Sequence, residues 1–194
     1  PERVDERLLD TMKRLPNVCD YLDLPMQHIS QHILNDMNRT DTSAHIREVC
    51  RMFKERGMML RTTLMVGFPG ETEEEFGQSL DFLRTCGLSM FHIFPYSRRK
   101  GTPAAAMPGQ IPNAVKERRA AEAASAAAEL EAAYHASMLG TTQQVLFEQE
   151  EDGLYAGHAM NYVKVYVQAV DLHNEIRAVR ITELCRDGVF GELE

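Results

Sequence analysis

Several features that would mark a special class of protein are missing from this sequence of 194 residues. No apolar run approaches the roughly 18 residues that a membrane span requires, and no basic stretch followed by an apolar one indicates a secretory signal. Hydrophobic residues make up 44% and charged residues 26%, a composition that excludes collagen-like and disordered chains. We therefore expect a folded cytoplasmic protein without a membrane partner.

Closely spaced cysteines are also missing. The four cysteines are Cys19, Cys50, Cys86 and Cys185, and no two are near enough in sequence to form a metal knuckle or a C-x-x-C redox pair. We expect free thiols in a reducing compartment. The formal charge of −8 argues against capture of nucleic acid by the whole surface, although a local basic patch remains compatible with it.

Helix-like and strand-like patterns alternate over the first half of the chain. Helical patterns cover residues 5–15, 42–56 and 73–86, and strand-like runs cover residues 21–24, 58–66 and 89–94. This alternation predicts an α/β fold with βα units and a parallel sheet or barrel. It resembles part of a TIM-like barrel.

The character of the sequence changes near Gly140. A loop over residues 98–112, with three prolines and two glycines, precedes an Ala-rich segment over 113–138 that predicts a long helix. Short alternating strands separated by turn signals follow at residues 144–148, 154–156, 162–167, 176–182 and 189–193. We predict a partial barrel with a closing helix over residues 1–139 and a small OB-like five-stranded β-barrel over 140–194.

A glycine-rich turn follows the second strand-like run. Gly67 and Gly70 flank a proline in the sequence Val-Gly-Phe-Pro-Gly-Glu-Thr over residues 66–72, at a junction between a strand and a helix. Amides at the start of a helix can meet a polar or anionic ligand, and α/β barrels place their sites at the carboxyl ends of strands. A turn that only caps the helix is the alternative.

A polar segment follows the first strand-like run. Gln27 and Ser30 can hydrogen-bond a ligand, and His28 can titrate near neutral pH. His28 and His32 are four residues apart and can share a helix face, but a metal site would need further ligands that the sequence does not identify. A polar strand end with one satisfied histidine is the alternative.

Three consecutive cations, Arg98, Arg99 and Lys100, follow the third strand-like run. They predict a phosphate contact, which Arg118 and Arg119 on the next helix can extend; a solvated loop is the alternative. The segment 140–194 holds four Lys or Arg against ten Asp or Glu, a formal charge of −6. That charge suits a basic partner better than a nucleic acid.

Together these loops resemble those of the radical SAM methylthiotransferases. The matching segments are residues 21–27, 37–39, 61–76, 94–97 and 101–103, and the terminal barrel resembles the TRAM domain of that family. The resemblance implies an incomplete barrel that binds S-adenosylmethionine at its strand ends. It also implies a 4Fe-4S cluster that cleaves this cofactor to a 5′-deoxyadenosyl radical, a second 4Fe-4S cluster on a preceding domain, and replacement of a C–H bond by C–SCH₃.

The resemblance also assigns a cofactor-binding set but no catalytic residue. By position in the motifs, the residues expected to line the cofactor site are Gln27, Ser30, Gly67, Gly70, Glu71, Tyr96 and Ser97. The family's C-x₃-C-x₂-C motif and the cysteines of its amino-terminal domain are absent from the sequence. Because thiolates must hold such a cluster, we expect a carboxy-terminal part that needs the missing amino-terminal portion of the enzyme and is inactive alone.

The two halves of the sequence resemble different branches of this family, and the branches differ in their substrate. Residues 21–30 and 60–63 resemble the branch that modifies an aspartate of a ribosomal protein, whereas 91–97, 101–110 and 157–162 resemble the branch acting on threonylcarbamoyladenosine in tRNA. We predict the tRNA branch, because the longer match includes the TRAM domain, with Arg98 to Lys100 as RNA contacts. The alternatives are a basic ribosomal protein as substrate, a chimeric sequence, a binding module without chemistry, and a fragment of another barrel enzyme.

Overall fold

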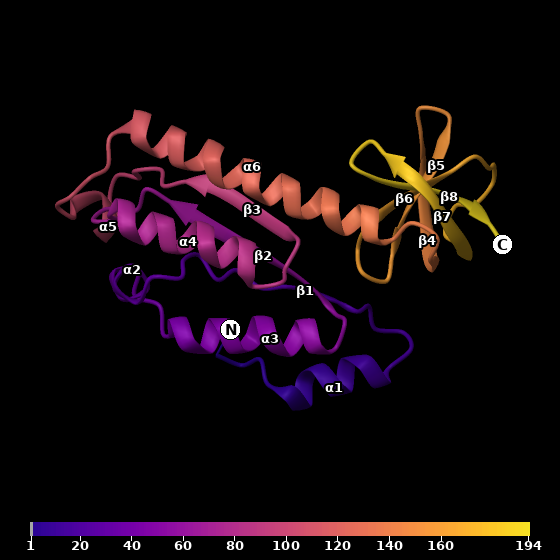
Figure 1. Ribbon diagram of the computed structural model, residues 1–194, viewed down its shortest axis with the longest axis horizontal. Helices are drawn as coiled ribbons and strands as arrows, with labels where there is room; N and C mark the ends of the chain where they lie inside the picture. Colours follow the sequence, from indigo (N-terminus) through magenta and orange to yellow (C-terminus); the bar gives the residue numbers. More distant parts are fainter. Residues whose placement is uncertain (1) are drawn as a thin grey trace. The chain divides into compact units, whose positions relative to one another are not determined.

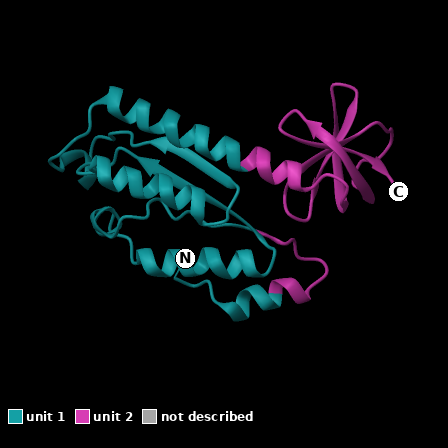
Figure 2. Cartoon of the chain, viewed as in Figure 1, with its two compact units in different colours: residues 1–11, 22–130 teal, residues 12–21, 131–194 magenta. Residues whose placement is uncertain are grey.

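The computed structural model describes residues 2–194, which divide into two compact units (Figures 1 and 2). The first unit holds residues 22–130 together with the segment up to Thr11, and the second holds residues 12–21 and 131–194. The division falls within helix α6 (Asn113–Ser137). The predicted boundary near Gly140 lies beyond this division, which follows Leu130, and falls between the end of α6 and the first strand of the barrel.

A three-stranded sheet in the order β1-β2-β3 organises the first unit. Its strands are β1 (Tyr21–Asp23), β2 (Met59–Val66) and β3 (Met90–Pro95). β2 and β3 run parallel, in register from Arg61 opposite Met90 to Val66 opposite Pro95. Gln27, just past β1, forms an isolated parallel bridge with Leu64. The carboxyl ends of all three strands therefore lie along one edge of the sheet.

The longer helices confirm the sequence patterns to within a residue or two at each end. They are α1 (Glu6–Arg14), α3 (Ser43–Glu55), α4 (Glu73–Thr85) and α6. Two short helices were not predicted, namely α2 (Gln31–Asp36) and α5 (Pro103–Ala106). Both are too short to show a hydrophobic period. α5 lies inside the segment predicted to be all loop, where Pro103 stands in the first helical turn.

One face of the sheet is covered by helices and carries the core. Leu64 and Val66 of β2 pack against Phe76 and Leu83 of α4 and Ala123 of α6. The alanines of α6 have little side chain to separate this helix from the sheet. Along β2 every second residue is buried, and the residues between them are only half-buried, because successive side chains of a strand point to opposite faces.

The second unit contains a closed five-stranded barrel, as predicted. Its strands pair in the order β4-β5-β6-β8-β7 and are β4 (Thr142–Glu151), β5 (Leu154–Ala159), β6 (Lys164–Val167), β7 (Ile176–Cys185) and β8 (Gly188–Leu193). Inward-facing side chains such as Val145, Phe147 and Val165 are fully buried. Closure removes the free sheet edges that an open β-domain must protect.

Among the residues that the structure describes, none of the helices is both long and apolar enough to cross a membrane.

Candidate functional site at the strand ends

Backbone hydrogen bonds hold the three strand ends side by side. The amide of Met65 donates to the carbonyl of Gln27 at 2.8 Å, and the amide of Gln27 donates to the carbonyl of Thr63 at 3.0 Å. The amide of Tyr96 donates to the carbonyl of Val66 at 2.8 Å. The structure thus brings Gln27, Gly67 and Tyr96 to one edge of the sheet, as the sequence predicted.

Two side chains at this edge carry buried polar atoms without a partner among residues 2–194. They are Oε1 of Gln27 and the hydroxyl of Tyr96. Gln27 also adopts a φ of 71°, a left-handed conformation that non-glycine residues rarely occupy. An unsatisfied buried polar group costs about 1–3 kcal/mol, and strained backbone tends to persist at binding sites. Both observations fit a binding edge at which a ligand supplies the missing hydrogen-bond partners.

Thr63 is a further candidate that the sequence analysis missed. Its hydroxyl is also buried without a hydrogen-bond partner in the described part of the chain. It belongs to the half-buried set of alternate β2 residues, on the face opposite the helices. The alternation along the strand was the available signal, because a Thr between buried Thr62 and Leu64 must point away from the core.

Glu71 is the centre of a buried polar cluster rather than a group facing a ligand. Its carboxylate contacts Nε2 of His28 at 3.0 Å and Nη1 of Arg119 at 2.6 Å, and it accepts the amide proton of Gly67. The side chains of His28 and Glu71 are fully buried, and that of Arg119 is 3% exposed. One carboxylate therefore ties together the loop after β1, the glycine turn and α6.

The tautomer of His28 follows from its neighbours. The amide of Ser30 donates to Nδ1 of His28 at 2.9 Å, so Nδ1 carries no proton. The ring proton is therefore on Nε2, which donates to Glu71. The buried charge pair of the cluster is consequently Glu71 with Arg119, whose other guanidinium nitrogen contacts the exposed Glu73 at 2.8 Å. His28 acts as a neutral hydrogen-bond bridge.

Ser30 and His32 contact a second glutamate, Glu75, in the first turn of α4. The hydroxyl of Ser30 donates to Oε1 of Glu75 at 2.7 Å, and Nδ1 of His32 contacts the same oxygen at 2.9 Å. Ser30 also caps α2, and Thr72 and Glu75 form a capping box for α4. Ser30, predicted to contact a cofactor, thus has its hydroxyl engaged by protein groups.

These contacts shift both titrating groups. Burial opposes ionisation of Glu75, but the backbone of Thr72 and the side chains of Ser30 and His32 outweigh it and hold the pKa of Glu75 at about 2. The hydrogen bond to Glu75 raises the pKa of His32, against a smaller effect of burial. His28 and His32 therefore serve different carboxylates. Within residues 2–194 no three His, Cys, Asp or Glu side chains are grouped to hold a metal ion.

The glycine turn is tightly packed. Gly67 has a φ of 72°, and a Cβ at this position would lie 2.3 Å from Cγ of Lys116 on α6. Gly70 has a φ of 86°, and its amide donates to the carbonyl of Gly109 at 3.0 Å. The N–H groups of both glycines thus donate to protein acceptors. The turn therefore shapes the edge of the site and does not offer these two N–H groups to an anion.

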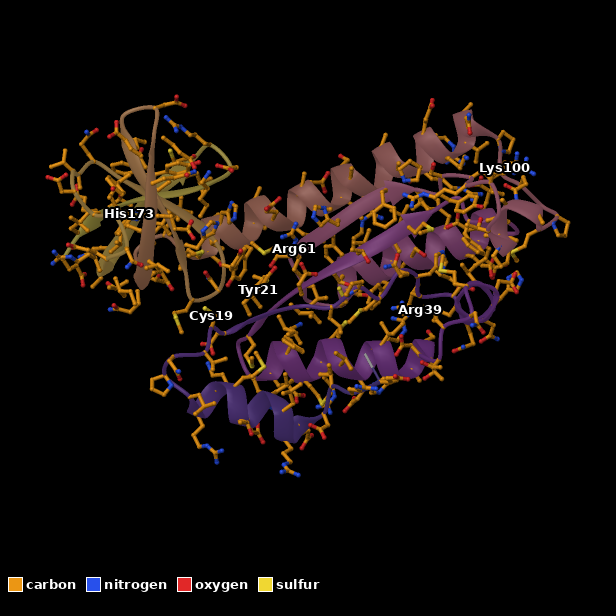
Figure 3. The ribbon with its side chains drawn as sticks, turned by 180° about the vertical axis from the view of Figure 1, so that it is seen from behind. Cys19, Tyr21, Arg39, Arg61, Lys100 and His173 are labelled. Atoms are coloured by element: carbon orange, nitrogen blue, oxygen red, sulfur yellow. The ribbon has the colours of Figure 1, made fainter. Side chains whose placement is uncertain are left out.

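The basic loop lies next to the edge, but the predicted extension along α6 is wrong. A cavity of about 360 Å³ is lined by Tyr96, Ser97, Arg98 and Lys116, among others, and Figure 3 shows Lys100 in the loop between β3 and α5. Arg99 and Lys100 are exposed. Arg118 and Arg119 do not join them, because Arg118 pairs with Glu73 at 2.7 Å and Arg119 is buried against Glu71.

The model of the radical SAM superfamily matches residues 1–83. The ribosomal protein uS12 methylthiotransferase RimO of Geobacter sulfurreducens is 37% identical over all of this chain and 46% of its own length. The protein of the same name from Heliobacterium modesticaldum is 39% identical over 82% of this chain and 35% of its own length. The chain spans about half the length of the curated relatives it matches.

A solved structure shows the same fold. Coproporphyrinogen III oxidase (HemN) from Escherichia coli, described as a radical SAM enzyme, superposes with a TM-score of 0.56 over 81% of this chain and 44% of that protein, at 14% identity. At that identity the likeness concerns the fold alone. The first unit is thus part of a radical SAM barrel, and the second contains a five-stranded barrel of the TRAM kind.

The comparisons overturn the predicted substrate branch. Eight curated relatives, at 32–39% identity, all carry the name ribosomal protein uS12 methylthiotransferase. The prediction of the tRNA branch is therefore wrong. It rested on the longer match in the second half of the chain, whereas the relatives that match over the full chain are named for the other branch.

Proposed function

Because the chain is related over its whole length to radical SAM methylthiotransferases, we propose that it is part of an enzyme that adds a methylthio group to ribosomal protein uS12. The observation that carries the proposal is the 37% identity to a uS12 methylthiotransferase across all 194 residues. In this proposal the chain contributes the end of the radical SAM barrel and the TRAM-like barrel. It is a transferase component that depends on further parts of the enzyme for turnover.

S-adenosylmethionine is the cofactor that the strand-end edge fits. When bound with a reduced iron–sulfur cluster, it supplies the radical that abstracts a hydrogen atom. The unsatisfied atoms of Gln27 and Tyr96 are the groups that would hydrogen-bond it, with Ser97 at the rim of the adjoining cavity. The Glu71 cluster does not contact the cofactor in this proposal; it fixes the two loops that do.

The described residues do not fit a 4Fe-4S cluster. Cys19 lies exposed in the segment between α1 and β1 (Figure 3), and Cys185 ends strand β7 of the barrel. Cys50 lies on α3 and Cys86 at the end of α4. No three of these thiols gather, so in the proposed enzyme the cluster ligands come from another part of the protein.

The charge of the second unit supports a basic protein as the substrate. Eight of the ten acidic side chains after Gly140 are exposed, at positions 148, 150, 152, 171, 183, 187, 192 and 194. The cations offer little compensation, since Lys164 pairs with Glu151 and Arg177 with Glu175. An acidic surface attracts a basic protein and repels phosphate. The phosphate contact predicted for Arg98, Arg99 and Lys100 remains an untested prediction.

The test is to delete the gene for this protein in its host and measure the intact mass of ribosomal protein uS12. We expect uS12 to lose the mass of one methylthio group, with hydrogen in its place, and the methylthiolated nucleosides of tRNA to stay unchanged. Unchanged uS12 would contradict the proposal.

Complementation then tests the cofactor edge. We expect a Tyr96→Phe gene to restore less methylthiolated uS12 than the wild-type gene, because the variant lacks one hydrogen-bonding group but keeps the ring. Tyr155→Phe, in the second barrel, is the matched control and should restore the wild-type level. Full restoration by Tyr96→Phe would show that the Tyr96 hydroxyl does not take part in cofactor binding.

A further inference from the structure

Two of the cysteines share a cavity that the strand-end site does not use. Cys50 on α3 and Cys86 at the end of α4 both line a cavity of about 230 Å³. α4 begins just after the carboxyl end of β2 and runs back along the sheet. Its last residues therefore lie toward the opposite edge of the sheet from Gly67 and Tyr96. The cavity is separate from the proposed cofactor edge.

The two thiols of the cavity are unequal. Cys50 is 1% exposed, whereas Cys86 is partly exposed. The thiol of Cys86 donates to the carbonyl of Leu83 at 3.4 Å, and the thiol of Cys50 lies 4.0 Å from Sδ of Met26. The neighbouring Cys86 thiol and burial raise the pKa of Cys50. The neighbouring Cys50 thiol, the amide of Leu88 and the charge of Arg47 lower the pKa of Cys86 against the effect of burial. Cys86 is thus the accessible thiol with more thiolate character, and Cys50 is a protected partner beside it.

The cavity is also cationic. Arg47, Arg51 and Lys54 of α3 line it together with the two cysteines. Arg51 forms ion pairs with Glu48 and Glu55, but within residues 2–194 no ion pair is found for Arg47 or Lys54. The stem of Lys54 covers Gly87, where an added Cβ would lie 2.6 Å from Cδ of Lys54. A positive charge therefore stands next to the turn that carries Cys86.

We propose that Cys86 and Cys50 form a redox-active dithiol that reacts with anionic low-molecular-weight disulfides such as glutathione disulfide. The thiolate of Cys86 attacks one sulfur of the small disulfide, whose S–S bond breaks and releases one thiolate. Cys50 then gives up its proton to solvent and attacks the sulfur of Cys86, which releases the second thiolate. The protein loses two electrons in forming its S–S bond, and the small disulfide gains them as two thiols.

Peptide mapping of the whole chain tests the pairing directly. The reduced protein is incubated with glutathione disulfide in the absence of oxygen, alkylated and digested with trypsin without reductant. Residues 48–51 and 85–98 are the tryptic peptides that hold Cys50 and Cys86, and we expect them to appear joined. Glutathione held on Cys86 without resolution, or a first reaction at exposed Cys19, would overturn the proposal.

Serine variants separate the two roles. Cys50→Ser should accumulate a stable mixed disulfide on Cys86, because the resolving thiol is gone. Cys86→Ser should leave Cys50 unmodified, because that thiol is buried. Cys185→Ser is the control and should form the same joined peptides as the wild type. Glutathione on Cys50 in the Cys86→Ser variant, or no mixed disulfide on Cys86 in the Cys50→Ser variant, would contradict the assignment.

The charge of the probe tests the cationic lining. Lys54→Gln should slow oxidation by glutathione disulfide by about threefold to tenfold, since local cations raise the encounter rate of an anionic reactant. The same variant should react with the uncharged bis(2-hydroxyethyl) disulfide at the wild-type rate. Equal slowing with both probes would show that Lys54 acts through structure and not through charge.

Discussion

The two units of this protein hold their loops in place by different means. In the first unit, an open sheet of three strands relies on side chains, because Glu71 joins the loop after β1, the glycine turn and α6 through buried polar contacts. In the second unit, five strands close on each other through backbone hydrogen bonds, and the charged side chains lie mostly at the surface. The first unit should therefore be sensitive to single polar side chains, and the second to backbone fit.

Removal of the Glu71 carboxylate is the change with the largest expected effect. Glu71→Ala removes the buried carboxylate that accepts from Arg119 and leaves this guanidinium only the exposed Glu73, at 2.8 Å, as an ion-pair partner. Breaking a buried pair typically costs about 3–5 kcal/mol, and the remaining contact with Glu73 places the expected loss at the lower end of that range. Hydrogen exchange should show faster opening of β2 and α4, while the amides of β4 to β8 keep their protection. Glu74→Ala, at an exposed position in the first turn of α4, is the control. Equal loss of protection in both units would contradict the contrast drawn here.

In the barrel, a close backbone contact tests the expectation that the second unit is sensitive to backbone fit. A Cβ on Gly157 of β5 would lie 2.2 Å from the carbonyl oxygen of Leu146 on the paired strand. We expect Gly157→Ala to destabilise the barrel by about 1–3 kcal/mol, read as faster exchange of β4 and β5 amides. Gly77→Ala on α4 has no atom within 4 Å of the added Cβ and should stabilise its helix by about 0.5–1 kcal/mol. The reverse order would refute the prediction.

The contribution of Glu75 to the stability of the first unit should depend on pH. Because the pKa of Glu75 is held at about 2, below its usual 4.5, the ionised group stabilises the fold fully above pH 4.5, and this contribution is lost as the pH falls toward 2. The loss of a capping carboxylate costs about 1 kcal/mol. Melting temperatures between pH 2 and 6 should therefore differ less between wild type and Glu75→Gln at the acid end than at pH 6.

His32 should act in the opposite direction. Its pKa is raised by Glu75, so its contribution is complete below pH 6.5 and is lost as the pH rises through the pKa in the folded state. Melting of His32→Gln should approach that of the wild type above this range. A difference between the two proteins that grows with pH would contradict the sign.

Exposed ion pairs of the barrel should matter least. Arg177 and Glu175 contact each other at 2.7 Å, but their side chains are 56% and 42% exposed. Such pairs contribute about 0–1 kcal/mol and are screened by salt. Arg177→Gln should shift the urea midpoint of the barrel very little, and any shift should shrink in high salt. A loss as large as that of Glu71→Ala would mean that side-chain charges also hold the barrel.

The sequence predicted what depends on local pattern. The helical patterns of α3 and α4 and the five barrel strands are encoded within short windows, and the sequence predicts them correctly. The burial of Glu71 was not predictable in this way. Glu71 precedes three further acids, at 73, 74 and 75, and only the fold brings Arg119, 48 residues later, onto its carboxylate.

The sequence predicted where the candidate site lies better than it predicted what each of its residues contacts. Parallel strands oblige their carboxyl ends to meet, so Gln27, Gly67 and Tyr96 were correctly expected together. The hydroxyl of Ser30 and the amide of Gly70 were expected to be free for a ligand, but both are engaged by protein groups from segments distant in the chain. Such long-range partners leave no trace in a local motif.

The packing of Lys116 over Gly67 constrains how this protein can diverge. The stem of Lys116 occupies the space where any side chain at position 67 would begin, and its ammonium group donates to the carbonyl of Tyr96 at 3.1 Å. A lineage that replaces Gly67 with Asn, which tolerates its positive φ, must also shorten residue 116. That second change removes a tether of the third strand end. Positions 67 and 116 should therefore be inherited as a pair.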